Sequence, residues 1–66
     1  MAVARVSKIT ASSTVGFEDA ANQGLKRATE TLRGITGFEV ISQKAKVEGG
    51  KIAEYRVTME VTFILD

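Results

Sequence analysis

A run of alternating side chains near the end of the chain constrains the fold more than any other feature. In AEYRVTMEVTFIL, residues 53–65, every second residue is apolar, and the residues between are polar except Ile64. Successive side chains of a β-strand point to opposite faces, so this period of two predicts a strand with one face in a core. The core set is Ala53, Tyr55, Val57, Met59, Val61, Phe63 and Leu65. We call the opposite side of the sheet, which carries Arg56 and Glu60, the second face.

Three further segments complete the predicted fold. β-Branched residues in rough alternation predict a first strand over residues 2–10, and residues 38–47 are expected to form a second strand. Between them, an apolar stripe with steps of three and four predicts a helix over residues 14–33. The stripe consists of Phe17, Ala21, Leu25, Ala28 and Leu32. The order β-α-β-β predicts an α+β fold, in which a three-stranded antiparallel sheet packs on one helix in a single domain, residues 1–66.

Both ends of the helix carry candidate capping residues. The segment ASSTVG, residues 11–16, predicts a loop before the helix. Ser13 is the expected N-cap, because its hydroxyl can accept a hydrogen bond from an unpaired amide of the first turn. Gly34 is expected at the C-terminal end, where a left-handed residue commonly closes a helix.

A pair of glycines is expected to join the second and third strands. Both central residues of EGGK, residues 48–51, tolerate the positive φ of a two-residue hairpin turn. This turn predicts a register on the second face with the pairs Val47–Ile52, Gln43–Arg56, Ile41–Thr58, Glu39–Glu60 and Gly37–Thr62. On the core face, the same register places Phe38, Val40 and Ser42 with Val61, Met59 and Val57.

The chain is short enough that one copy has difficulty forming a stable core. A domain of about 60 residues buries only ~60% of its unfolded surface. The sequence has neither Cys nor His, which excludes disulfides and thiolate or imidazole metal sites. Oligomerisation, or a cation bound by oxygen atoms, remains as a source of stability. The predicted third strand is also longer than the helix, so we expect neighbouring subunits to cover an overhanging hairpin where Tyr55 and Ile52 lack partners within one chain.

Charge and motifs argue against several classes of function. The net charge is +1, which gives no strong attraction to nucleic acid or to a membrane surface. No segment is long enough to span a bilayer and no signal peptide is recognisable, so the expected location is the cytoplasm. The chain has no His, no Cys, no phosphate-binding glycine loop and no nucleophile elbow, so we expect that it is not an enzyme.

The sequence closely resembles the dodecin family over nearly its whole length. The motifs that carry the resemblance are RATETLR at the end of the helix, FEV at the start of the second strand, and EYRVTMEVTF in the third. The resemblance implies a homododecameric shell that stores or buffers flavins (FMN, FAD or riboflavin) and is not an enzyme. Its partners would be its own copies and a small ligand.

The two residues that the family uses to bind flavin are both different here. A Trp that stacks on the flavin ring precedes FEV in the family, and this chain has Gly37 there. A Gln that hydrogen-bonds the edge of the ring is replaced by Arg56. Glycine offers no stacking surface, and an arginine donates hydrogen bonds but accepts none. We therefore expect flavin binding to be weakened or lost, although an arginine is able to stack on a ring or to pair with a phosphate.

Other charged residues suggest two alternatives. Glu39 and Glu60 face each other in the predicted register, and like charges directly opposite are destabilising. A salt bridge to Arg56 or to a lysine of a neighbouring subunit would relieve this repulsion. A bound calcium or magnesium ion would do so as well, and Glu48 or Asp66 could contribute to its site. The basic residues near the turn, Lys44, Lys46 and Lys51, are interpreted as solvated edge charges, with a channel or a phosphate contact as the alternative. A purely structural assembly is the remaining hypothesis.

Overall fold

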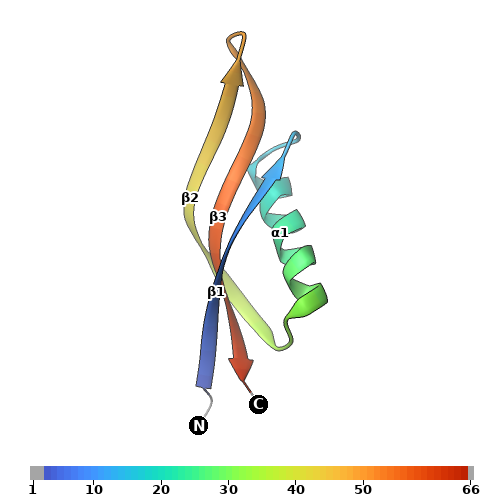
Figure 1. The fold of residues 1–66 in the computed structure, drawn as a ribbon, viewed down its shortest axis with the longest axis vertical. Helices are drawn as coiled ribbons and strands as arrows, with labels where there is room; N and C mark the ends of the chain where they lie inside the picture. The colour runs from blue at the N-terminus through green and yellow to red at the C-terminus, as the bar shows by residue number, and fades with distance from the viewer. Residues whose placement is uncertain (1–2, 66) are drawn as a thin grey trace.

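The computed structural model describes residues 3–65 and contains one helix packed on a three-stranded sheet (Figure 1). The elements are β1 (Val3–Ser13), α1 (Phe17–Thr31), β2 (Ile35–Glu48) and β3 (Lys51–Leu65). All strand pairs are antiparallel, and the longest strand, β3, lies in the middle of the order β1-β3-β2. The predicted β-α-β-β order and fold class are confirmed. Residue 2 of the predicted first strand lies outside the described residues.

Strand lengths differ from the sequence prediction at several ends. Residues 11–13 continue β1 and pair with residues 55–57 of β3, so the prediction that they belong to a loop is wrong. The hairpin strands are longer than expected, because pairing continues to Glu48 and Lys51 on either side of the turn. Gly49 and Gly50 have φ angles of 57° and 75°, as a tight two-residue turn requires.

The helix is shorter than predicted at both ends, and its caps differ. It begins at Phe17 because the carbonyl of Gly16 accepts the first helical hydrogen bond, from Ala20. Ser13 is not the N-cap: its hydroxyl accepts from the backbone N–H of Val15 and donates to Asp19. At the other end the C-cap is Leu32 rather than Gly34, which lies two residues further on. Gly34 is left-handed as expected, with a φ of 73°, and its carbonyl accepts from Ile64 of β3.

Three irregularities interrupt the pairing of β2 with β3. Near the helix end of the strand, Gly37 faces Thr62 and Glu39 faces Glu60, as predicted. One extra residue on β2 at Ile41 then shifts the register, and an extra residue on β3 at Ala53 shifts it back before the turn. A third shift lies between Ile35 and Gly37. Such bulges locally place two residues of one strand opposite one residue of its partner.

The bulges overturn three predicted pairs and change the faces of several side chains, among them Ser42 and Gln43. Thr58 faces Ser42 rather than Ile41, and Arg56 faces Lys44 rather than Gln43. Ser42 therefore lies on the second face and not in the predicted core. Gln43 takes the opposite side, because it faces Val57.

The core lies between the helix and the central strand. Val57, Met59 and Val61 of β3 are buried together with Ala20 and Ala28 of α1. The buried helix positions are Ala20, Gly24 and Ala28, whereas the other four residues of the predicted stripe are only half-buried. A Cβ atom at Gly24 would lie 2.5 Å from Cε of Met59, so the close approach of helix and sheet depends on this glycine.

Much apolar surface remains outside this core. Phe38 and Val40 lie on the helix side of the sheet, as predicted, but they are 42% and 40% exposed. The β2–β3 hairpin extends beyond the helix (Figure 1), in a molecule with extents of 51 × 19 × 13 Å. Near its tip, Val47 and Ile52 are 62% and 51% exposed, in agreement with the predicted overhang.

Tyr55 does not share the exposure of the hairpin tip. Its ring packs edge-on against that of Phe17, with the ring centroids 5.0 Å apart, so the prediction that it lacks a partner within one chain is wrong. Phe17 is the first residue of α1, so the start of the helix lies beside Tyr55. No helix within residues 3–65 is long and apolar enough to cross a membrane.

Candidate ligand-binding face

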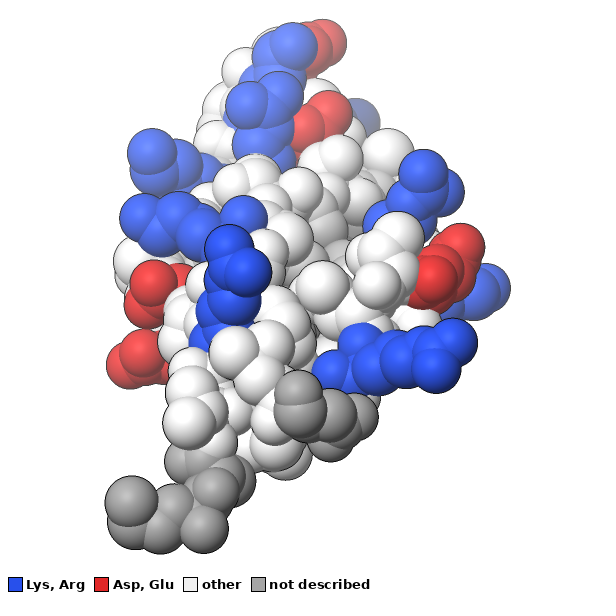
Figure 2. All heavy atoms as spheres, turned by 60° about the horizontal axis from the view of Figure 1, so that its bottom comes forward, with Lys and Arg blue, Asp and Glu red and all other residues white. Residues whose placement is uncertain are grey.

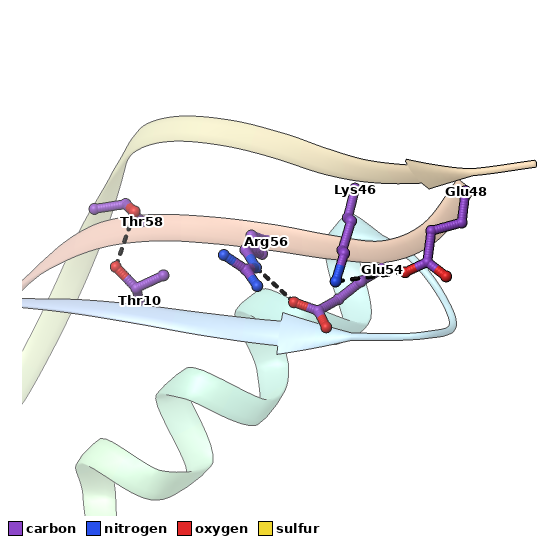
Figure 3. Close-up of polar contacts among 6 residues, drawn as sticks. All are labelled: Thr10, Lys46, Glu48, Glu54, Arg56 and Thr58. Atoms are coloured by element: carbon purple, nitrogen blue, oxygen red, sulfur yellow. Dashed lines mark hydrogen bonds and ion pairs between the residues drawn. The ribbon is translucent and has the colours of Figure 1, made fainter. Parts of the chain in front are cut away.

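The second face consists of rows of side chains that cross all three strands. One row holds Lys8, Glu60 and Glu39; the next holds Thr10, Thr58 and Ser42; the third holds Ser12, Arg56 and Lys44. We call these the acidic, hydroxyl and basic rows. The Oγ1 atoms of Thr10 and Thr58 are 2.9 Å apart (Figure 3), which places their side chains on the same side of the sheet. The face thus changes from carboxylates to cations over a short length of strand.

Gly37 and Arg56 lie on the same face but far apart. Gly37 faces Thr62, which is six residues from Arg56 along β3. At about 3.3 Å per residue, this separation is roughly 20 Å. One chain therefore does not bring these two positions together, and a site that uses both needs a second copy of the chain.

The surroundings of Gly37 leave room for a larger side chain. A Cβ atom added there would meet nothing within 4 Å. Gly37 is also not among the glycines with positive φ, so its backbone does not require glycine. The absence of a side chain at this position is a property of this sequence rather than a demand of the fold.

The two glutamates of the acidic row are directly opposite, as the sequence predicts. Glu60 also has Lys8 as its neighbour on the other strand, although the ion pairs among the described residues are Lys46–Glu48 and Arg56–Glu54. Within residues 3–65, no three carboxylates come close enough together to hold a metal ion. Glu48 lies at the hairpin end and pairs with Lys46 at 3.4 Å, and Asp66 lies outside the described residues. A cation at Glu39 and Glu60 would therefore need further oxygen ligands, from water or from another subunit.

The basic row borders a shallow, open hollow near the hairpin. Its volume is about 350 Å³, and its lining residues are Lys44, Ala45, Lys46 and Arg56. Nε of Arg56 donates to Oε1 of Glu54 at 2.5 Å (Figure 3). Lys51 faces Glu48 beside the turn and does not line the hollow. The sequence prediction missed the pairing of Lys44 with Arg56, because the bulge at Ile41 shifts every pair between it and Ala53.

Charged side chains of both signs are interspersed over the surface. In Figure 2, uncharged atoms fill the middle of the visible face, while Lys and Arg surround it with small groups of Asp and Glu between them. On this face the basic side chains are separated by uncharged atoms and by small groups of acidic side chains.

Comparison with known proteins assigns the fold to a family. The family model for dodecin matches residues 3–66. The chain belongs to the dodecin family. A dodecin from Streptomyces davaonensis is 37% identical, with a TM-score of 0.94 and coverage of 98% of this chain and 96% of its own. A mutant of the Thermus thermophilus dodecin is 32% identical, with a TM-score of 0.95 and coverage of 100% and 98%.

One further dodecin bears on the acidic row. A calcium-chelating antigen from Mycobacterium tuberculosis, named calcium dodecin, is 34% identical to this chain. It covers 97% of this chain and 91% of its own, with a TM-score of 0.83. A search among curated proteins found no significant match. These comparisons establish the dodecin fold of this chain.

Proposed function

We propose that this dodecin forms a homododecameric shell that binds and stores a small ligand on its second face, and that its flavin binding is weakened or lost. The observation that carries the proposal is the placement of Gly37 and Arg56. They share one face but lie roughly 20 Å apart along a strand. A ligand site that includes both positions is completed only when two chains meet.

Exposed apolar side chains supply the second argument for assembly. Five apolar side chains are buried among the described residues, while Phe38, Val40, Val47 and Ile52 are at least 40% exposed. A small domain that leaves this much apolar surface in water gains stability when further copies cover it. The family resemblance implies that the number of copies is twelve.

The residues at the family's flavin positions argue for weak flavin affinity. Gly37 lacks the stacking surface that a Trp provides, and its surroundings offer no substitute within 4 Å of a Cβ atom. Arg56 has no acceptor atom, so it cannot accept a hydrogen bond from a flavin N–H group as an amide side chain would. Storage rather than catalysis fits a chain without His or Cys.

Calcium binding is the second candidate function. Glu39 and Glu60 lie directly opposite each other, and a chain 34% identical to this one is a calcium-chelating dodecin. Calcium takes six to eight oxygen ligands, whereas two carboxylates supply at most four. The remaining ligands would come from water or from oxygen atoms of a neighbouring subunit in the assembled shell.

Paired titrations test the two candidates. The assembled protein is titrated with FMN, followed by flavin fluorescence, and in parallel with calcium chloride, followed by calorimetry. The proposal expects FMN affinity weaker than micromolar. A submicromolar FMN affinity would overturn the weakened flavin site. A calcium signal that disappears in a Glu60→Gln variant would favour the second candidate, and a signal that persists in that variant would reject the assigned carboxylates.

A further inference from the structure

The guanidinium of Arg56 presents only hydrogen-bond donors on the second face. Its Nε–H is donated to Oε1 of Glu54 at 2.5 Å, as Figure 3 shows. Two Nη groups remain, and together they carry four N–H donors and no acceptor. The two N–H groups at the end of the guanidinium plane are parallel, so they match two acceptor atoms that lie side by side in one plane. Arg56 is therefore equipped to bind an edge with two adjacent acceptors.

Glu54 both holds this fork and cancels its charge. The two residues are two positions apart on β3, so their side chains lie on the same face of the strand. The carboxylate is the more buried partner, with a side-chain exposure of 31% against 53% for Arg56. A side chain that is already held loses less freedom when a ligand binds. Because the pair is neutral, a ligand without charge is able to bind without leaving a cation unbalanced.

The hollow beside this fork has room for a flat ring. Its volume is about 350 Å³, and Arg56 lines it together with Lys44, Ala45 and Lys46. The methyl group of Ala45 and the aliphatic stems of the two lysines supply apolar surface for the face of a ring, while the ammonium groups stay in water. A planar heterocycle in the hollow would present its edge to the Nη groups of Arg56.

We propose that Arg56, positioned by Glu54, binds a neutral planar heterocycle through an edge that carries two adjacent acceptor atoms. The 6-oxopurine ring is the model for this class, because its O6 and N7 atoms are the acceptor pair to which arginine binds in a bidentate manner. An amino group in place of O6 would set a donor against a donor and lose one of the two bonds. This inference rests on the proposed function, since it names the ligand class for the same face of the shell.

Calorimetric titrations of the full chain with inosine and with adenosine test the proposal. The two nucleosides have the same sugar and no charge, but inosine presents O6 and N7, whereas adenosine presents an amino group beside N7. Inosine should bind at least about fivefold more tightly than adenosine. Arg56→Gln should reverse this preference, because an amide side chain pairs with the amino group and N7 of adenine. Arg56→Lys keeps the charge without the fork, so its affinities for the two nucleosides should agree within about twofold.

Two variants of Glu54 test its role as a positioning residue. Glu54→Ala removes the acceptor of the Nε–H, so the preference for inosine should fall by about threefold or more. Glu54→Gln keeps an oxygen acceptor and should recover most of the preference. Lys51→Gln is the matched control for charge, because Lys51 belongs to the same hairpin but faces Glu48 and does not line the hollow. The ratio of the two affinities should be unchanged in this control.

Equal affinities of the unmodified protein for inosine and adenosine would overturn the proposal, and so would an inosine preference that persists in Arg56→Gln or Arg56→Lys. Failure to bind inosine at millimolar concentration would overturn it as well. An unchanged preference in Glu54→Ala would reject the role of Glu54. Circular dichroism of each variant establishes that the fold is retained, and the native mass of each sample is recorded alongside. A dodecamer without the preference rejects the inferred ligand class only, whereas a monomer rejects the proposed shell.

Discussion

Restoring an aromatic side chain at Gly37 is expected to restore flavin binding. The position lies on the second face, where a Cβ atom meets nothing within 4 Å, and its backbone does not need glycine. A Gly37→Trp variant should therefore fold and assemble like the unmodified protein. Its indole ring would supply the stacking surface that is missing.

The size of the gain follows from burial and stacking. Covering a large aromatic side chain contributes about 1.5–3 kcal/mol, and ring stacking adds about 0.5–1.5 kcal/mol. We therefore expect FMN binding to improve by about 2–4 kcal/mol, which is roughly 30- to 1,000-fold in the dissociation constant. Adding Arg56→Gln should lower the dissociation constant for FMN by a further factor of roughly three to ten. The glutamine can accept a hydrogen bond from a flavin N–H group, which the arginine cannot.

Quenching of flavin fluorescence measures this change directly. Gly16→Trp is the matched control, because Gly16 also has open space around its Cβ position and an extended backbone, with a φ of 172°. It introduces the same side chain at the start of α1, so flavin affinity should stay at the level of the unmodified protein. If Gly37→Trp folds and assembles but binds FMN no more tightly than Gly16→Trp, the assignment of Gly37 to the ligand site is wrong.

Other changes test the core, the overhang and the cation hypothesis. Met59 is fully buried, so Met59→Ala should lower the free energy of unfolding, measured by urea titration, by about 2–5 kcal/mol. Gly24→Val overpacks the contact between helix and sheet and should lower the free energy of unfolding by about 1–3 kcal/mol. Val15 is exposed, so Val15→Ala is the control and should change the free energy of unfolding by less than ~0.5 kcal/mol. Equal effects at all three sites would contradict the described core. Ile52→Glu should shift the assembly toward smaller species in size-exclusion chromatography with light scattering, and an unchanged profile would argue against a covered overhang. If the protein binds calcium, its melting temperature should be higher in excess calcium than in EGTA, and identical melting would count against that function.

The sequence was sufficient to predict the elements and their order, because each depends on a local pattern. Alternation along residues 53–65 and the glycine pair at residues 49–50 are enough to define a hairpin with a buried face. The bulges were not predictable in this way. Those at Ile41 and Ala53 cancel, so the register is right near both ends of the hairpin and wrong between them. A period-two pattern does not indicate where two compensating bulges occur, because their positions depend on how two long, twisted strands fit together.

The same limitation explains which parts of the candidate site were found. Glu39 and Glu60 lie outside the segment between the bulges at Ile41 and Ala53, so their pairing was predicted correctly. The pairing of Lys44 with Arg56 lies between the bulges and emerged only from the structure. The helix cap at Gly16 was missed for a different reason. Ser13 has the side chain of a good cap, but it lies three residues before Gly16, and its hydroxyl forms hydrogen bonds with Val15 and Asp19.

Native mass spectrometry of the purified protein, before and after denaturation, tests the proposed storage shell most directly. We expect a species of twelve chains under native conditions. Extra mass that leaves on denaturation would identify the stored ligand, and its value would distinguish a purine-type heterocycle, a flavin and calcium. A monomer or dimer at micromolar concentration would contradict the shell, and with it a ligand site completed by a second chain.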